Sequence, residues 1–252
     1  MSTVTDPLAP LLQLDGVAQA CDRARDALAA VHRHPINLRG WDKTATEASW
    51  RAGRSSAAID GGSVELTRNG DLGDPILSGA MRVAQALDGQ SLSQLVSTWR
   101  RAPLQVLARL QLLAAADLTD DAVQLGRPRT SADVAARLDM LAQLLTGGTH
   151  VPAPLLAAVV HGEILALQPF GVGNGIVARA ASRLTCAASG LDPHNLGVPE
   201  VTWFKRLTDY RVRSAAFAAG DPDGLRDWLM LSCDALESGA AEAKSIADAA
   251  RA

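Results

Sequence analysis

The chain has 252 residues, of which 48% are hydrophobic and 20% are charged, ordinary values for a globular protein with its own core. Its formal net charge of −3 and isoelectric point near 5.9 exclude the strongly basic surface that nucleic-acid binding requires. No stretch reaches the ~18 uncharged apolar residues that a membrane-spanning helix needs. We therefore expect neither nucleic acid nor a membrane among the partners of this protein.

Three cysteines lie far apart along the chain, at Cys21, Cys186 and Cys233. Their spacing and odd number favour neither a disulfide framework nor a zinc site. The segment Met1 to Pro10 has no basic region followed by a long apolar one, so it does not resemble a secretion signal. The expected location is the cytoplasm, where the thiols stay reduced.

Helical periodicity dominates the sequence, and the abundance of alanine with few aromatic residues favours helices over sheets. The segments expected to be helical are 7–33, 44–59, 75–88, 91–99, 103–117, 131–145, 152–167, 174–189, 198–218 with interruptions, and 222–249. Residues 60–75 and 117–129 have the composition of loops. The prediction is an all-α protein in which 1–120 form an N-terminal helical region and 121–252 form the core, within one compact unit.

Local signals set several of these boundaries. Pro35 is expected to end the first helix, Gly61 and Gly62 the second, and Gly147 with Gly148 the one that follows 117–129. We expect the side chain of Ser131 to cap that helix at its start.

A glycine-rich turn at 171–175 leads directly into the helix predicted from Asn174. Glycines allow positive φ angles and let a ligand approach the backbone closely. The helix start behind them offers unpaired N–H groups and a partial positive charge, which together favour phosphate. The same residues would also suit a plain turn between two helices, so from these residues alone the two readings stay open.

The segment 161–179 resembles the signature of the Fic (Fido) family, which reads His-Pro-Phe-x-Asp/Glu-Gly-Asn-Gly-Arg-x-x-Arg. The positions in register are Pro169, Phe170, Gly173, Asn174, Gly175 and Arg179. The resemblance implies a Fic-like helical bundle whose motif forms a helix-loop-helix at 152–189. It also implies that five of these residues contact a phosphorylated ligand: Phe170, Gly173, Asn174, Gly175 and Arg179.

A second segment resembles the inhibitory helix found in one branch of that family, whose motif is Ser/Thr-x-x-x-Glu-Gly/Asn. Here Ser56, Asp60 and Gly61 match it at the end of the helix 44–61, with aspartate in place of glutamate. The resemblance implies that Asp60 engages Arg179. Such a contact has two interpretations, a relic of autoinhibition that blocks the pocket or a simple link between two helices.

Three positions depart from the family motif: Gln168 replaces its histidine, Val172 its carboxylate and Ile176 its first arginine. Family members typically transfer AMP from ATP, using the histidine as a base and the carboxylate to hold Mg²⁺ on the phosphates. Glutamine takes up no proton near neutral pH, and valine offers no oxygen to a hard cation. The sequence therefore predicts a degenerate motif without Mg²⁺ and without competent AMP transfer. ATP or another phosphorylated ligand stays a candidate cofactor.

The family also has a β-hairpin flap ahead of its motif, which holds a target peptide. Here Gly126 to Arg129 passes almost directly to the helix that follows Ser131, and Pro128 would interrupt a strand ladder. We expect the flap hairpin to be absent.

Other polar residues are candidates to replace the catalytic groups that the motif lacks here. His161 and Glu163 precede the turn and form a candidate acid–base pair, although a spacing of two points them to different sides of a helix. A structural histidine bonded within the bundle is the simpler interpretation of His161. Between Asp192 and Asn195, and at Glu200, the polar side chains suit either a site or a helix connection.

For three further candidate residues we expect structural roles. We expect Cys186 to be a core residue, and Arg211 and Arg213 to lie on a solvated face unless they supply charge to the pocket.

Three functional hypotheses follow. The first is a Fic-like pseudoenzyme that binds a protein partner or a small phosphorylated ligand. The second is an enzyme of changed chemistry in the same pocket, and the third is a structural interaction module.

Overall fold

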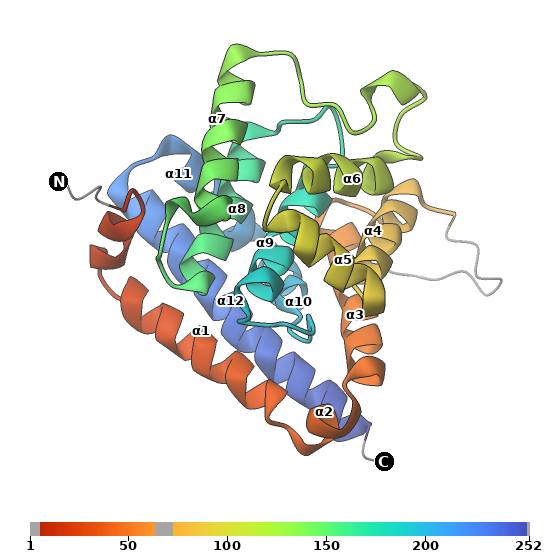
Figure 1. Cartoon of the computed structure of the whole chain (residues 1–252), viewed down its shortest axis with the longest axis vertical. Helices are drawn as coiled ribbons and strands as arrows, with labels where there is room; N and C mark the ends of the chain where they lie inside the picture. The colour runs from red at the N-terminus through yellow and green to blue at the C-terminus, as the bar shows by residue number, and fades with distance from the viewer. Residues whose placement is uncertain (1–5, 64–72, 251–252) are drawn as a thin grey trace.

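Helices make up the regular structure of the computed structural model, which describes residues 6–63 and 73–250 (Figure 1). Within these residues there is no strand, and the predicted all-α class is confirmed. None of the helices in the described ranges has the length and apolar character to cross a bilayer.

Twelve α-helices are present in the described part of the chain. They are α1 (Val17–His32), α2 (Pro35–Gly40), α3 (Asp42–Ile59), α4 (Pro75–Ala86), α5 (Gly89–Trp99), α6 (Pro103–Ala115), α7 (Ala132–Gln143), α8 (Ala153–Leu167), α9 (Asn174–Ser189), α10 (Pro199–Lys205), α11 (Leu207–Ala219) and α12 (Pro222–Ala249). Short 3-10 helices lie at Ala9–Gln13 and Ala122–Gln124, and a wide helical turn at Leu144–Gly148 follows α7.

The predicted helix at 7–33 is wrong at its start, because Gly16 takes a φ of 77° and separates the 3-10 helix from α1. Pro35 does end α1, but it also opens α2, a helix that the sequence analysis missed. Proline is well tolerated at a first helical position, since the missing N–H would be unpaired there. The His34 ring accepts a hydrogen bond from the Ile36 N–H and caps α2.

Two further predicted helix boundaries differ from the structure, and part of one predicted loop lies outside the described residues. Ser131 stands before α7, but its side chain makes no capping bond. The predicted helix 198–218 is divided into α10 and α11 at Arg206, whose φ of −111° and ψ of 39° are not helical. Of the predicted loop at 60–75, residues 64–72 lie outside the described residues.

The helix-loop-helix predicted at 152–189 is confirmed as α8 and α9, which pack against each other at the centre of the molecule (Figure 1). α1 and α12 run side by side and cover α8, while α3, α4, α5 and α6 pack on α9. Twelve of the sixteen residues of α9 are buried, so this helix is a core element along most of its length. Residues 116–131 contain no strand, as expected for a chain without the flap hairpin.

α4 and α6 approach so closely that a side chain does not fit between them at Gly79. A Cβ at this position would lie 2.0 Å from the backbone oxygen of Ala114. Gly40, at the end of α2, has no atom within 4 Å of the corresponding point.

We predict that Gly79→Ala lowers the free energy of unfolding by about 1–3 kcal/mol, because the two helices must move apart to admit the methyl group. Gly40→Ala is the matched control and should be neutral or slightly stabilising, since alanine is the better helix former. Urea denaturation of both variants measures the difference. Equal stability of the two variants would contradict the close packing of α4 on α6.

Candidate functional site

The turn between α8 and α9 is closed by the side chain of Asn174. Its Oδ1 accepts a hydrogen bond from the Phe170 N–H at 2.9 Å, and its Nδ2 donates to the Phe170 carbonyl at 2.8 Å. Gln168 ends α8 in a left-handed conformation, and Gly173 has a φ of 80° just before α9 begins. The ring of Phe170 is buried, so the turn is fixed from inside as well as by Asn174.

Gln111, a buried residue of α6, holds the turn from one side. Its amide nitrogen donates to the Val172 carbonyl at 3.3 Å, and its amide oxygen accepts from the Gly126 N–H at 2.6 Å. The side chain thereby joins the glycine-rich turn to the segment before α7. Gln111 was not among the residues predicted from the sequence, although a polar residue within an apolar helical stripe is the signal that could have found it.

Arg129 holds the end of α8, from the segment where the family resemblance places a flap. Its Nε donates to the Gln168 carbonyl and its Nη2 to the Leu167 carbonyl, both at 2.8 Å. The Arg129 N–H also donates to the Pro169 carbonyl at 2.7 Å. These contacts satisfy carbonyl groups that a helix end leaves unpaired, and a cation near a helix C-terminus is favourable.

The carboxylate of Asp60 lies at the start of α9. One oxygen is 2.8 Å from Nη2 of Arg179, and a Cβ built on Gly175 would lie 2.5 Å from both oxygens. Only glycine therefore fits at position 175 while Asp60 keeps this place. The two residues that the sequence paired are brought together, and a negative charge near a helix N-terminus is favourable.

Arg179 is 1% exposed and has its donors directed at three partners. Nε donates to the Ser56 hydroxyl at 2.8 Å, Nη2 to the Ser56 carbonyl at 2.9 Å, and Nη1 to the Tyr210 hydroxyl at 3.3 Å. Burial alone would lower the pKa of Arg179, but Asp60 and Tyr210 raise it above its ordinary value. The guanidinium stays charged and links α3, α9 and α11.

The candidate acid–base pair is not brought together. His161 is buried and bonded through Nε2 to the Tyr210 hydroxyl at 2.8 Å, and burial together with the charge of Arg179 holds its pKa well below 6.5. Glu163 lies near the surface of α8, where its carboxylate accepts from Nε of Arg137 at 2.7 Å. Tyr210, the only tyrosine in the sequence, was not singled out.

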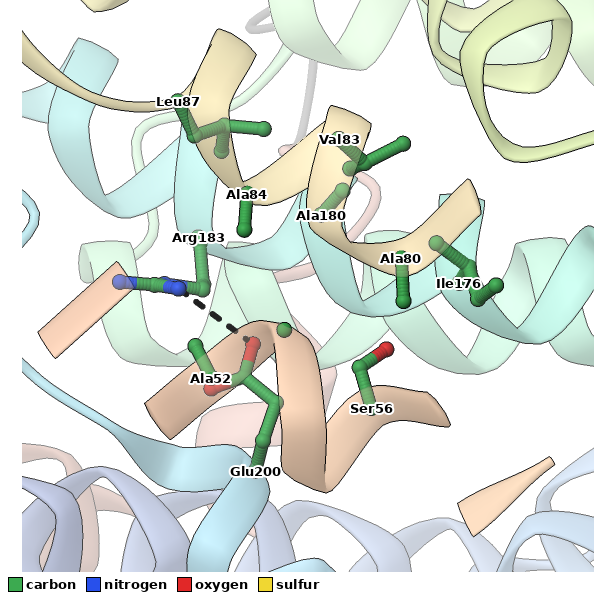
Figure 2. Close-up of a pocket in the computed structure, with 11 residues that line it drawn as sticks. Ala52, Ser56, Ala80, Val83, Ala84, Leu87, Ile176, Ala180, Arg183 and Glu200 are labelled. Carbon is green, nitrogen blue, oxygen red and sulfur yellow. Dashed lines mark ion pairs between the residues drawn. The ribbon is translucent and has the colours of Figure 1, made fainter. Parts of the chain in front are cut away.

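The three departures from the motif occupy different surroundings. Gln168 is exposed and Val172 is half-buried. Ile176 is only 2% exposed and lies in the apolar core. Ile176 lies beside Ala80 of α4 in a narrow cavity between α3, α4 and α9 (Figure 2). The position that the resemblance aligns with the family's first arginine thus holds a packing residue. Within residues 6–63 and 73–250, no group of three or more metal-binding side chains is present.

That cavity has a volume of about 20 Å³, room for about one water molecule. Its polar wall is formed by Ser56 and by Arg183 and Glu200, which approach to 3.8 Å (Figure 2). Burial raises the pKa of Glu200, and its second oxygen has no hydrogen-bond partner. Asn195 accepts hydrogen bonds from Arg183 through its side chain and its carbonyl. Asn195, in the turn after α9, and Glu200, in α10, thereby hold Arg183, the second arginine of α9.

Asp192 and His194 belong to the turn that follows α9. Asp192 is buried and accepts from the N–H groups of Leu196 and Gly197, and its Oδ1 lies 2.8 Å from Nε2 of His32. The ring of His194 stacks on Trp41 at 4.0 Å. These contacts tie the turn to α1 and to the start of α3.

The remaining candidates have structural contacts. Cys186 is buried in the core, which raises the pKa of its thiol. Arg211 donates to the Ile59 carbonyl at 3.4 Å, next to Asp60, and Arg213 donates to the Asp227 carbonyl at 3.0 Å. Gly61 is exposed, with a φ of 88° that ends α3.

No protein-family model matches the chain, and no curated protein matches its sequence. Solved structures do resemble it. A Fic family protein from Desulfovibrio desulfuricans G20 has a TM-score of 0.71 at 18% identity, over 91% of this chain and 74% of the other. A fragment of Fic-1 from C. elegans has a TM-score of 0.68 at 17% identity, over 94% of this chain and 74% of the other. A variant of that fragment has a TM-score of 0.70 at 17% identity, over 90% of this chain and 72% of the other. The chain therefore has a Fic-like fold, as the resemblance implied.

The low pKa of His161 has a consequence for stability. Below pH 6.5 the unfolded chain takes up a proton at this residue and the folded chain does not, so the free energy of unfolding falls as the pH drops. We predict that the wild type loses roughly 1–2 kcal/mol more than His161→Gln between pH 6.5 and pH 5.

Urea denaturation at each pH measures this difference. His150→Gln, at an exposed histidine, is the control and should keep the wild-type pH dependence. The same pH dependence in His161→Gln and the wild type would show that His161 takes up its proton in the folded chain.

Proposed function

We propose that this chain is a Fic-like binding protein that holds a phosphorylated ligand at the start of α9, in exchange for the Asp60 carboxylate, and does not transfer AMP. The observation that carries the proposal is the position of that carboxylate against Gly175 and beside Arg179. An anion of this protein already lies where helix N–H groups and a buried cation favour negative charge. An external phosphate would meet the same groups.

The turn is built to keep this shape. Asn174 closes it, and Gln111 and Arg129 hold its carbonyl groups from outside. A preformed turn costs little further ordering when a ligand binds. The binding groups are therefore fixed in advance, and the variable element is Asp60, whose side chain is 27% exposed at the C-terminal end of α3.

The residues of the turn favour binding without metal. Val172 offers no oxygen to Mg²⁺, and the ligand charge is balanced by Arg179 and the helix start. Gln168 is exposed at the turn but takes up no proton near neutral pH, so it offers no base to an attacking hydroxyl. We propose that binding persisted while the groups needed for AMP transfer were replaced.

Removing the competing carboxylate tests this proposal. We predict that Asp60→Ala binds inorganic phosphate, AMP or ATP about tenfold or more tightly than the wild type, because the ligand no longer displaces a charge paired with Arg179. Isothermal titration calorimetry without metal gives the affinities. The three ligands distinguish a phosphate site from a nucleotide site.

Asp15→Ala is the matched control, since it removes one exposed carboxylate ahead of α1. It should bind like the wild type. Asp60→Ala leaves Arg179 uncompensated and is expected to be less stable, so thermal unfolding is measured beside each titration. Equal affinities in a folded Asp60→Ala and the wild type would refute the proposed exchange.

A second measurement addresses AMP transfer. We predict that wild-type protein and Asp60→Ala, incubated with ATP labelled at the α-phosphate and Mg²⁺ or Mn²⁺, acquire no label. The physical reason is that Gln168 and Val172 supply neither the base nor the metal ligand for this reaction. Clear labelling of either protein, seen after electrophoresis, would favour an enzyme instead.

A further inference from the structure

Arg179 is held from two directions. Ser56 lies in the last turn of α3 and Asp60 directly follows that helix, so any movement of the end of α3 changes these contacts together. Tyr210 belongs to α11 and contacts Nη1 from another side. Among the described residues, Tyr210 is the one partner of the guanidinium whose position does not depend on α3.

The donor and the acceptor of each hydrogen bond at the Tyr210 hydroxyl follow from the chemistry of the side chains involved. Arginine donates and never accepts, so the Tyr210 oxygen accepts from Arg179. The Tyr210 hydroxyl proton is then available to Nε2 of His161, 2.8 Å away, in the neutral tautomer that carries its proton on Nδ1. We assign this tautomer to His161.

The surroundings of His161 agree with this assignment. Burial and the charge of Arg179 lower the pKa of His161, and both favour the neutral ring. Among the described residues Nδ1 has no hydrogen-bond partner. The rings of Trp203 and Trp228 lie with their centroids 4.6 Å and 5.0 Å from that of the imidazole, at interplanar angles of 64° and 70°.

The aromatic packing is separate from the hydroxyl contact. Tyr210 lies in a buried cluster with Trp203, Phe217 and Trp228, and these rings enclose it whether or not it has a hydroxyl group. Tyr210→Phe would keep the packing and remove only the hydroxyl group, which bonds to Arg179 and His161. The chemistry of the hydroxyl can therefore be tested apart from the core.

We propose that Tyr210, with its hydroxyl oriented by His161, is a positioning residue that keeps the Arg179 guanidinium directed at the start of α9 when Asp60 withdraws. This inference rests on the proposed exchange of Asp60 for an anionic ligand. His161 acts through Tyr210 and Tyr210 through Arg179, so neither touches the ligand.

The test compares variants in the Asp60→Ala background, with inorganic phosphate as the probe in calorimetry. Adding Tyr210→Phe is expected to weaken phosphate binding about tenfold, the size of one lost hydrogen bond to a charged group. His161→Leu, which cannot accept from the hydroxyl, should weaken it similarly. His161→Gln should restore binding, because its amide oxygen reaches the position of Nε2. Thermal unfolding of every variant shows whether it is folded.

A second readout separates this inference from the proposed function. In protein without ligand, ¹⁵N NMR follows rotation of the Arg179 guanidinium, and Arg179→Lys identifies its signals. Rotation should be faster in Asp60→Ala/Tyr210→Phe than in Asp60→Ala. If Asp60→Ala fails to bind phosphate, the proposed function fails, and the rotation still decides the role of Tyr210. Unchanged rotation, or unchanged affinity in a folded double variant, would overturn the positioning role.

Discussion

The buried charge of Arg179 is the constraint on which the site depends. A cation that is 1% exposed needs compensation from every direction, and the chain provides it from α3 and α11. Buried ion pairs add little net stability to a fold, but losing one partner is costly. They therefore fix how the helices are arranged more than they stabilise the folded state. Here the arrangement places the Asp60 carboxylate at the N-terminus of α9.

The glycine-rich turn keeps its shape through contacts from outside the motif. Gln111 and Arg129 come from α6 and from the segment before α7, and together they bind the carbonyl groups of Val172, Gln168 and Leu167. That segment contains no strand in the described part of the chain, yet it still meets the turn through the Arg129 backbone. A turn whose carbonyl groups are already bound has few alternative conformations.

The three departures from the family motif have unequal structural meaning. Gln168 and Val172 remain at the turn, so their chemistry can be changed without disturbing the core. Ile176 packs beside Ala80 and lines the small cavity between α3, α4 and α9 (Figure 2). An arginine there would have to enter an apolar site, where an unpaired charge is expensive. This departure belongs to the packing of α9, and reversing it would disturb the fold.

The sequence by itself determined the helical class, most helix boundaries and the helix-loop-helix at α8 and α9, while the pairing of Asp60 with Arg179 was implied by the family resemblance. Those features follow from local periodicity, glycine and proline positions, and a motif read along the chain. Only the tertiary structure decided that His161 is buried against Tyr210, that Tyr210 and Gln111 complete the site, and that Pro35 opens a helix as well as ending one. These depend on contacts between residues far apart in the sequence, whose hydrogen-bond partners no local pattern specifies.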